Sequence, residues 1–224
     1  MRFHGVDIIA RGLTARGARG CAFAGVSLDI EAGRLAVITG PGGSGRTSLL
    51  LALAGRMRIV AGSAAVGGWR LPDDARRVRE VVGVARAEPA VGLDDELRVG
   101  DLVQERMLIA PGVDGAAVAD AMALLEVDAP GRTAVADLPP DQRTLLAVAL
   151  TAAEGPGVVV VDDTTRGCDP AGSDRVWTGL RALGEHGCTV LASTAEALPA
   201  LDDSITVIEL PHPTERDRIP LPEE

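Results

Sequence analysis

Residues 40–48, with the sequence GPGGSGRTS, have the residue types and the spacing of a loop that binds phosphate groups. Glycine lets the backbone approach a phosphate closely, and the free N–H groups at the start of a following helix attract anions. A threonine hydroxyl directly after such a loop can contact Mg²⁺. The alternative, an ordinary glycine-rich turn, is less favoured, because a strand-like run precedes the loop and a helical run follows it. The candidate nucleotide-binding residues are Gly40, Pro41, Gly42, Gly43, Ser44, Gly45, Arg46, Thr47 and Ser48.

Two acidic residues follow a second apolar run, the valines at 158–161. In proteins with a phosphate loop, an acid at the end of such a strand holds Mg²⁺, often through water, and Asp162 has this position. Asp163 is the candidate to orient an attacking water. A strand that ends in solvated acids is the plain alternative, but the glycine loop earlier in the chain favours the functional interpretation. The candidate Mg²⁺ ligands are therefore Thr47 and Asp162.

Arg46 stands where the loop pattern G-x-x-x-x-G-K-[ST] requires lysine. All 22 basic residues of the chain are arginine, so a general replacement of lysine by coding bias is one explanation. Arginine keeps the positive charge, but its planar fork is larger than an ammonium group and is aimed differently. The chemistry of the loop therefore depends on whether it makes room for the guanidinium.

Alternating apolar and helical patterns predict the elements that position these residues. Strands alternating with helices predict a mainly parallel sheet with helices on both faces, an α/β fold. A hairpin is expected to turn at Gly67 and Gly68. Further strands are expected at 3–10, 22–30, 34–40, 81–86, 157–161, 188–194 and 204–210, and helices at 46–57, 139–153 and 170–187.

Composition narrows the class of function. The net charge of −10 argues against a nucleic-acid surface, which needs clustered cations. The apolar runs are too short for a membrane span or a signal peptide. We therefore expect a cytoplasmic protein, which could lie at the inner face of the cell membrane. Cys21, Cys168 and Cys188 lack the spacing of a metal site or a disulfide framework. The proline-rich, charged tail at 211–224 is expected to be disordered.

Over almost its whole length the chain resembles the ATP-binding cassette (ABC) ATPases. The segment VSLDIEAGRLAVITGPGGSGRTSLLLALAG resembles their opening strands, phosphate loop and first helix. LPPDQRTLLAVALTAAEGPGVVVVDDTTRGCDP is similar to their signature helix, acidic strand and D-loop, and GCTVLASTAEALPALDDSITVIEL to the segment that carries a switch histidine. The resemblance implies one domain at 1–210, with an N-terminal antiparallel β portion and a helical subdomain near 98–137.

The resemblance also implies ATP, Mg²⁺, head-to-tail dimers that sandwich ATP, and membrane-spanning transporter partners. The dimer could be a homodimer or a heterodimer with another ABC ATPase. The residues expected at its interface are Leu138, Asp141 and Gln142 of the signature segment and Asp169 of the D-loop.

Several positions depart from the family pattern. The signature L-S-G-G-Q is LPPDQ here, and its prolines offer no N–H to a phosphate. Asp141 adds a like charge, which at about 4 Å and an effective dielectric of ~20 repels by about 4 kcal/mol. Pro-Pro-Asp is nevertheless a good helix start. The remaining departures are Asp163 for the catalytic glutamate, Ala87 for the Q-loop glutamine, Ala195 for the switch histidine and Gly17 near the adenine-stacking aromatic.

These departures favour an ABC-type protein that binds Mg-ATP with weak or absent hydrolysis and serves as a subunit or regulator of a membrane transporter. A fully active transporter ATPase is one alternative. An interaction protein that no longer binds nucleotide is another, less favoured because the loop glycines, Thr47 and Asp162 are kept.

Overall fold

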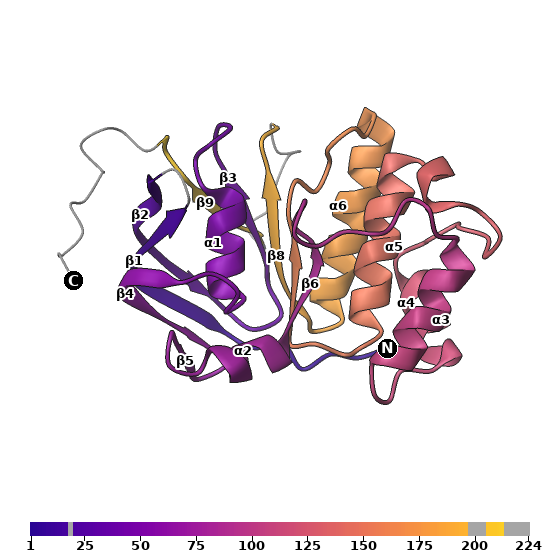
Figure 1. Ribbon diagram of the computed structural model, residues 1–224, viewed down its shortest axis with the longest axis horizontal. Helices are drawn as coiled ribbons and strands as arrows, with labels where there is room; N and C mark the ends of the chain where they lie inside the picture. Colours follow the sequence, from indigo (N-terminus) through magenta and orange to yellow (C-terminus); the bar gives the residue numbers. More distant parts are fainter. Residues whose placement is uncertain (18–19, 197–204, 213–224) are drawn as a thin grey trace.

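The computed structural model describes residues 1–17, 20–196 and 205–212 of the chain. An antiparallel sheet, a parallel sheet and a group of helices follow one another along the long axis in Figure 1. The strands are β1 (Ile8–Gly17), β2 (Gly20–Ile30), β3 (Leu35–Thr39), β4 (Ile59–Val66), β5 (Trp69–Leu71), β6 (Val82–Arg86), β7 (Val158–Val161), β8 (Thr189–Thr194) and β9 (Ile205–Glu209). The helices are α1 (Arg46–Leu53), α2 (Ala75–Val81), α3 (Val99–Ile109), α4 (Gly115–Leu124), α5 (Pro140–Ala152) and α6 (Pro170–Glu185).

The parallel sheet has the strand order β6-β7-β8-β3-β9. Its central strands are buried on both faces, as their continuous apolar runs indicate. Because side chains alternate between the faces of a strand, Val159 and Val161 join one core cluster while Val158 and Val160 join the other. The first cluster packs against α5 and α6, and the second against α1 and the antiparallel sheet. The expected α/β fold with helices on both faces is confirmed.

The antiparallel sheet has the order β2-β1-β4-β5, and β4 and β5 form the hairpin expected at Gly67 and Gly68. The first strand was expected at 3–10 and instead begins at Ile8. The backbone N–H groups of Phe3 and Gly5 donate to the carbonyl groups of His186 and Gly187, so the first residues pair with that turn rather than with the sheet.

The region 98–137, expected to be helical, contains α3, α4 and a short 3-10 turn at Val135–Asp137. α4 packs against α5, at the end of the molecule opposite the antiparallel sheet (Figure 1). No helix in the described part of the chain is long and apolar enough to cross a membrane. Of the tail expected to be disordered, residues 213–224 lie outside the described residues.

Candidate functional site

The site lies at the carboxyl ends of three neighbouring strands. β3 ends at Thr39 and leads into the glycine loop, and β7 ends directly before Asp162. β8 lies between these two strands, so its last residues lie beside both the loop and the acids. In open α/β sheets, ligands bind outside the carboxyl ends of the strands, and this is where the candidate residues meet.

The loop has a backbone that glycine alone can follow. Gly40, Gly43 and Gly45 all have φ in the left-handed half of the Ramachandran map, at 151°, 83° and 93°. A Cβ on Gly45 would lie 2.2 Å from the carbonyl oxygen of Ala22. A Cβ on Gly42 would meet no atom within 4 Å in the described part of the chain. Gly45 is thus required by packing, whereas Gly42 borders open space.

A cavity of about 460 Å³ lies between this loop and the facing ends of β1 and β2, at Gly17 and residues 20–22. The hydroxyl of Ser44 is buried beside it without a hydrogen-bond partner among the described residues. A buried polar atom without a partner favours a polar ligand. The cavity, the orphan hydroxyl and the glycine backbone together fit a phosphate-bearing ligand.

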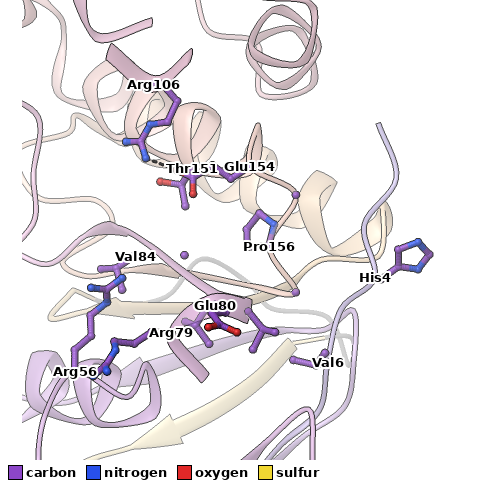
Figure 2. Close-up of a pocket in the computed structure, with 15 residues that line it drawn as sticks. His4, Val6, Arg56, Arg79, Glu80, Val84, Arg106, Thr151, Glu154 and Pro156 are labelled. Carbon is purple, nitrogen blue, oxygen red and sulfur yellow. Dashed lines mark hydrogen bonds and ion pairs between the residues drawn. The ribbon is translucent and has the colours of Figure 1, made fainter. Parts of the chain in front are cut away.

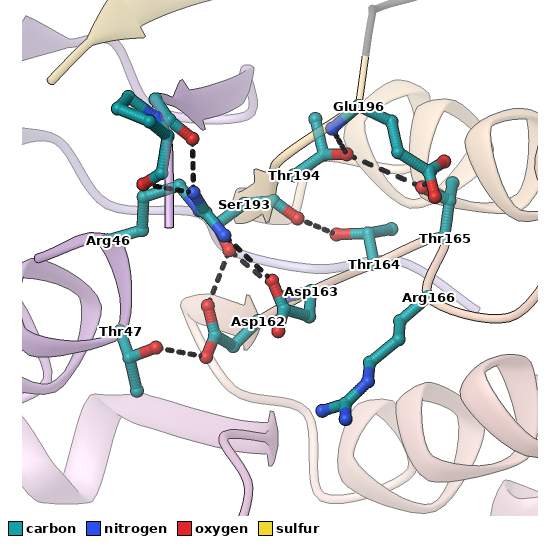
Figure 3. Close-up of polar contacts among 12 residues, drawn as sticks. Arg46, Thr47, Asp162, Asp163, Thr164, Thr165, Arg166, Ser193, Thr194 and Glu196 are labelled. Carbon is teal, nitrogen blue, oxygen red and sulfur yellow. Dashed lines mark hydrogen bonds and ion pairs between the residues drawn. The ribbon is translucent and has the colours of Figure 1, made fainter. Parts of the chain in front are cut away.

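Asp162 is the centre of a buried hydrogen-bond cluster (Figure 3). Its side chain is only 3% exposed, and its two carboxylate oxygens accept separate hydroxyl donors. Thr47 Oγ1 donates to Oδ2 at 2.5 Å, and Ser193 Oγ donates to Oδ1 at 2.5 Å. The structure therefore brings together the two residues expected to bind Mg²⁺, and oxygen donors of this kind suit that ion.

Arg46 does not point into solvent but folds back over the loop. Its Nη1 donates to the carbonyl oxygens of Gly40 and Pro41, the latter at 3.0 Å. Its Nη2 donates to Asp163 Oδ1 at 3.1 Å, an ion pair in which the arginine side chain is 10% exposed (Figure 3). The loop thus makes room for the guanidinium, which contacts the acid expected to orient water.

Ser193 is a site residue that the sequence analysis missed. Besides donating to Asp162, its hydroxyl accepts the backbone N–H of Asp163 at 3.0 Å. One side chain from β8 thereby holds both acids that follow β7. Ser193 could be found only from the order of the strands, which places β8 beside β7, and no pattern in the sequence reveals that order.

Ala195, at the position of the family's switch histidine, follows β8 and is exposed. Next to it, Glu196 accepts a hydrogen bond from Thr165 Oγ1 at 2.9 Å, and its N–H donates to Thr194 Oγ1. These contacts join the end of β8 to the segment after Asp163. A methyl side chain at 195 has no group to donate to a phosphate.

The wall of the cavity opposite the loop consists of small residues: Gly17, Gly20, Cys21 and Ala22. Gly17, near the position where the family has an adenine-stacking aromatic, therefore lines the cavity, and the described residues of this wall offer no aromatic ring to a base. Cys21 is partly exposed there, whereas burial raises the pKa of the Cys188 thiol to about 12. Burial, followed by the charge of Asp141, also raises the pKa of Cys168.

Ala87, at the Q-loop position, is completely buried, and its N–H donates to the carbonyl of Val91. The charged neighbours of Ala87 were not anticipated. Arg86 donates to Thr144 Oγ1 at 2.9 Å and pairs with Glu88 at 3.4 Å. These contacts connect the end of β6 to α5.

The signature-like segment starts α5, as expected: Pro139 is its N-cap and Pro140 its first residue. Asp141, expected to add a like charge against a phosphate across the dimer, has its charge paired within the chain, and its effect on a phosphate stays a prediction. Asp141 is 3% exposed and accepts a hydrogen bond from Arg175 Nε at 2.8 Å. Burial raises the pKa of this carboxyl, but the hydrogen bond and charge of Arg175 outweigh burial and lower it below its usual value.

The other residues expected at a dimer interface also have contacts within the chain. Leu138 is 8% exposed, and Gln142 Oε1 accepts the N–H of Asp128 at 2.7 Å. Asp169 caps α6 by accepting the N–H of Gly172. Their place in a dimer stays a prediction, and each has a structural role in the monomer.

A second cavity, of about 370 Å³, lies at the opposite, amino end of β6 and β7 (Figure 2). Three arginines line it, but Arg79 donates to the carbonyl of Gly55 and Arg106 pairs with Glu154. It has neither a glycine loop nor a threonine–aspartate pair among its lining residues. The candidate nucleotide-binding residues therefore lie at the cavity at the carboxyl ends of the strands and not at this one.

Comparisons with known proteins show the family and the fold of this chain. A family model described as "ABC transporter" matches residues 23–166. Nod factor export ATP-binding protein I of Burkholderia lata is 30% identical over 194 residues, which cover 83% of this chain and 62% of that protein. The chain thus spans less than two thirds of the length of this curated relative.

Solved structures share the fold. A nucleotide-free ATP-binding cassette from an ABC transporter has a TM-score of 0.71 at 16% identity and covers 88% of this chain and 82% of the other. A bacterial Atm1-family ABC exporter with ATP bound has a TM-score of 0.72 at 18% identity, and the match covers 94% of this chain and 38% of the exporter chain. With the family model matching most of the chain, this protein belongs to the ABC transporter family, as an ATP-binding cassette.

Proposed function

We propose that this chain is the nucleotide-binding subunit or regulator of a membrane transporter that binds Mg-ATP weakly and hydrolyses it very slowly or not at all. The observation that carries the proposal is the state of Arg46. Its two terminal nitrogens are bonded to two loop carbonyls and to Asp163. A phosphate must compete with these partners for the charge that the loop provides.

Binding of Mg-ATP is supported by the parts that remain. ABC ATPases bind ATP together with Mg²⁺. In this chain Thr47 and Asp162 would hold the ion, and the backbone of the glycine loop would hold the phosphates. The ion would supply positive charge against the phosphate oxygens. Without an aromatic ring in the cavity wall the site lacks base stacking, which contributes roughly 1 to 3 kcal/mol per base in nucleic-acid complexes.

Slow hydrolysis follows from three separate changes. The cation is engaged by Asp163, the water-positioning acid is one methylene shorter than glutamate, and Ala195 cannot donate to a phosphate. A lost donor of this kind typically costs about 2.7–4 kcal/mol. Two such losses correspond to at least roughly 10⁴-fold in rate, since 1.36 kcal/mol is tenfold. The free energies of such losses within one site need not add, so this factor gives only the order of magnitude of the expected decrease in rate.

The alternatives remain distinct. A fully active transporter ATPase would need Arg46 to leave Asp163 whenever ATP binds. A protein without nucleotide binding would leave the Ser44 hydroxyl and the 460 Å³ cavity unexplained. A transporter partner, a peripheral cytoplasmic location and a dimer are proposed because relatives include export ATP-binding proteins, and dimeric cassettes are among the similar structures.

Calorimetry and phosphate release test the proposal. The wild type is expected to bind Mg-ATP in the upper micromolar to millimolar range, and to turn over far below an ordinary rate of about 1 per second. Arg46→Lys alone is expected to leave turnover low, whereas Arg46→Lys/Asp163→Glu/Ala195→His should raise it.

Three results would contradict parts of the proposal. Ordinary turnover by the wild type would identify a working motor. The absence of heat and of a thermal shift at millimolar Mg-ATP would identify an interaction protein. Restoration of turnover by the single lysine would show that Arg46 is the only defect.

A further inference from the structure

The ion pair between Arg46 and Asp163 joins the loop to the segment after β7, two residues that are 117 positions apart in the chain. Arg46 is 10% exposed and Asp163 34%, so the pair is partly shielded from water. Both terminal nitrogens of the guanidinium have partners, and Nε is buried without one in the described ranges. The two terminal nitrogens of the loop's cation are therefore already engaged inside the chain.

The backbone of Asp163 is held in an unusual conformation. Its φ is 43°, in the left-handed region that non-glycine residues rarely adopt. Its N–H donates to Ser193 Oγ at 3.0 Å, and its carbonyl accepts the N–H of Arg166 at 3.1 Å. Aspartate and asparagine tolerate this region better than most side chains, and residues held there are often found where a side chain must be aimed. Here this conformation aims the carboxylate at Arg46 (Figure 3).

The position of this pair relative to a bound nucleotide follows from the loop. The backbone of a phosphate loop surrounds the inner phosphates, and the basic residue at the start of its helix reaches the outer ones. Asp163 lies one residue beyond Asp162, whose carboxylate contacts Thr47. A terminal phosphate that bonds to Arg46 must therefore displace Asp163 and meet its negative charge, whereas a diphosphate extends less far toward it.

We infer that Asp163 acts as an internal anion that competes with the terminal phosphate for Arg46. The pair is then a specificity determinant that makes the site bind nucleoside diphosphate at least as tightly as triphosphate. This inference rests on the proposed function and extends it, because it states which nucleotide state the site prefers and which residue sets the preference.

Affinities of the full chain for Mg-ADP and for a Mg-bound, non-hydrolysable ATP analogue test the inference without any hydrolysis. Asp163→Asn removes the charge, nearly preserves the shape and tolerates the positive φ. It is expected to tighten binding of the analogue at least about tenfold, or about 1.4 kcal/mol, and that of ADP less than about threefold. Asp163→Gly, which relieves the positive φ, makes the same test if the asparagine variant does not fold.

Asp120→Asn is the matched control. Asp120 lies exposed on α4 and forms no ion pair within the described residues. The Asp120→Asn variant loses the same charge far from the loop, so we expect it to change neither the affinity for Mg-ADP nor that for the ATP analogue. A wild type that prefers ADP or binds both nucleotides equally, together with a selective gain for the analogue in Asp163→Asn, supports the inference.

Two outcomes would overturn it in distinguishable ways. In the first, the wild type binds nucleotide, but Asp163→Asn changes the affinities for both ligands equally or not at all. This result would overturn the internal-anion role and leave the proposed function standing. No binding of either nucleotide to the wild type or any variant would overturn the proposed function and this inference together.

Discussion

Replacing Ser193 by alanine should destabilise the protein more than its small change in size implies. Its hydroxyl is a buried donor to Asp162 Oδ1 and an acceptor for the N–H of Asp163. A net hydrogen bond to a charged group contributes about 1.5–3 kcal/mol, and a buried partner left unsatisfied adds to the loss. The Asp163 N–H is only partly buried, so water can replace part of its bond. We expect Ser193→Ala to lower the free energy of unfolding by about 2–3 kcal/mol.

Denaturant unfolding followed by circular dichroism measures this loss. For a chain of this length the same change lowers Tm by roughly 4–12 °C. Ser63→Ala, on an exposed position of β4, is the matched control and should stay within about 0.5 kcal/mol of the wild type. Weaker binding of Mg-nucleotide is also expected, because Asp162 loses one of its two hydroxyl partners. A loss below about 1 kcal/mol would refute the view that Ser193 holds both acids.

Three further predictions concern other parts of the site. Mg-ATP should protect Cys21 from maleimide, measured by peptide mass spectrometry, while the buried Cys188 should react only after unfolding; labelling of Cys21 that ignores nucleotide would place the ligand elsewhere. Gly45→Ala should lower Tm, because its Cβ would lie 2.2 Å from a carbonyl oxygen, whereas Gly42→Ala should keep the fold and weaken only nucleotide binding; equal Tm values would contradict the packing argument. Arg175→Ala should destabilise the protein at neutral pH. The lowered pKa of Asp141 means that its ion pair stabilises the fold above the unfolded-state pKa and is lost as pH falls through the folded-state value, so the difference from wild type should shrink in acid; a constant difference would argue against the pair.

Local patterns in the sequence were sufficient for the main elements of the fold. The continuous valine run at 158–161 predicts a strand buried on both faces, and this is what β7 is, because such runs are typical of parallel sheets. The prolines at 139 and 140 predict a helix start, because proline suits the first turn of a helix. The first strand was misplaced because Phe3 and Gly5 pair with a turn 180 residues or more away, and no local pattern records that partner.

The candidate site divides in the same way. The residue types at 40–48 and at 162–163 are enough to propose phosphate and Mg²⁺ chemistry, since glycine conformation and oxygen donors are properties of single residues and short spacings. Which side chains meet depends on the order β7-β8-β3, which only the tertiary structure determines. That order places Ser193 between the acids and the loop, and it brings Arg46 to Asp163 and Thr47 to Asp162. The sequence by itself thus determined the class of ligand, whereas the tertiary structure decided that the loop's cation and its neighbouring acid satisfy each other, because charges far apart in the chain interact only when folding brings them within hydrogen-bond distance.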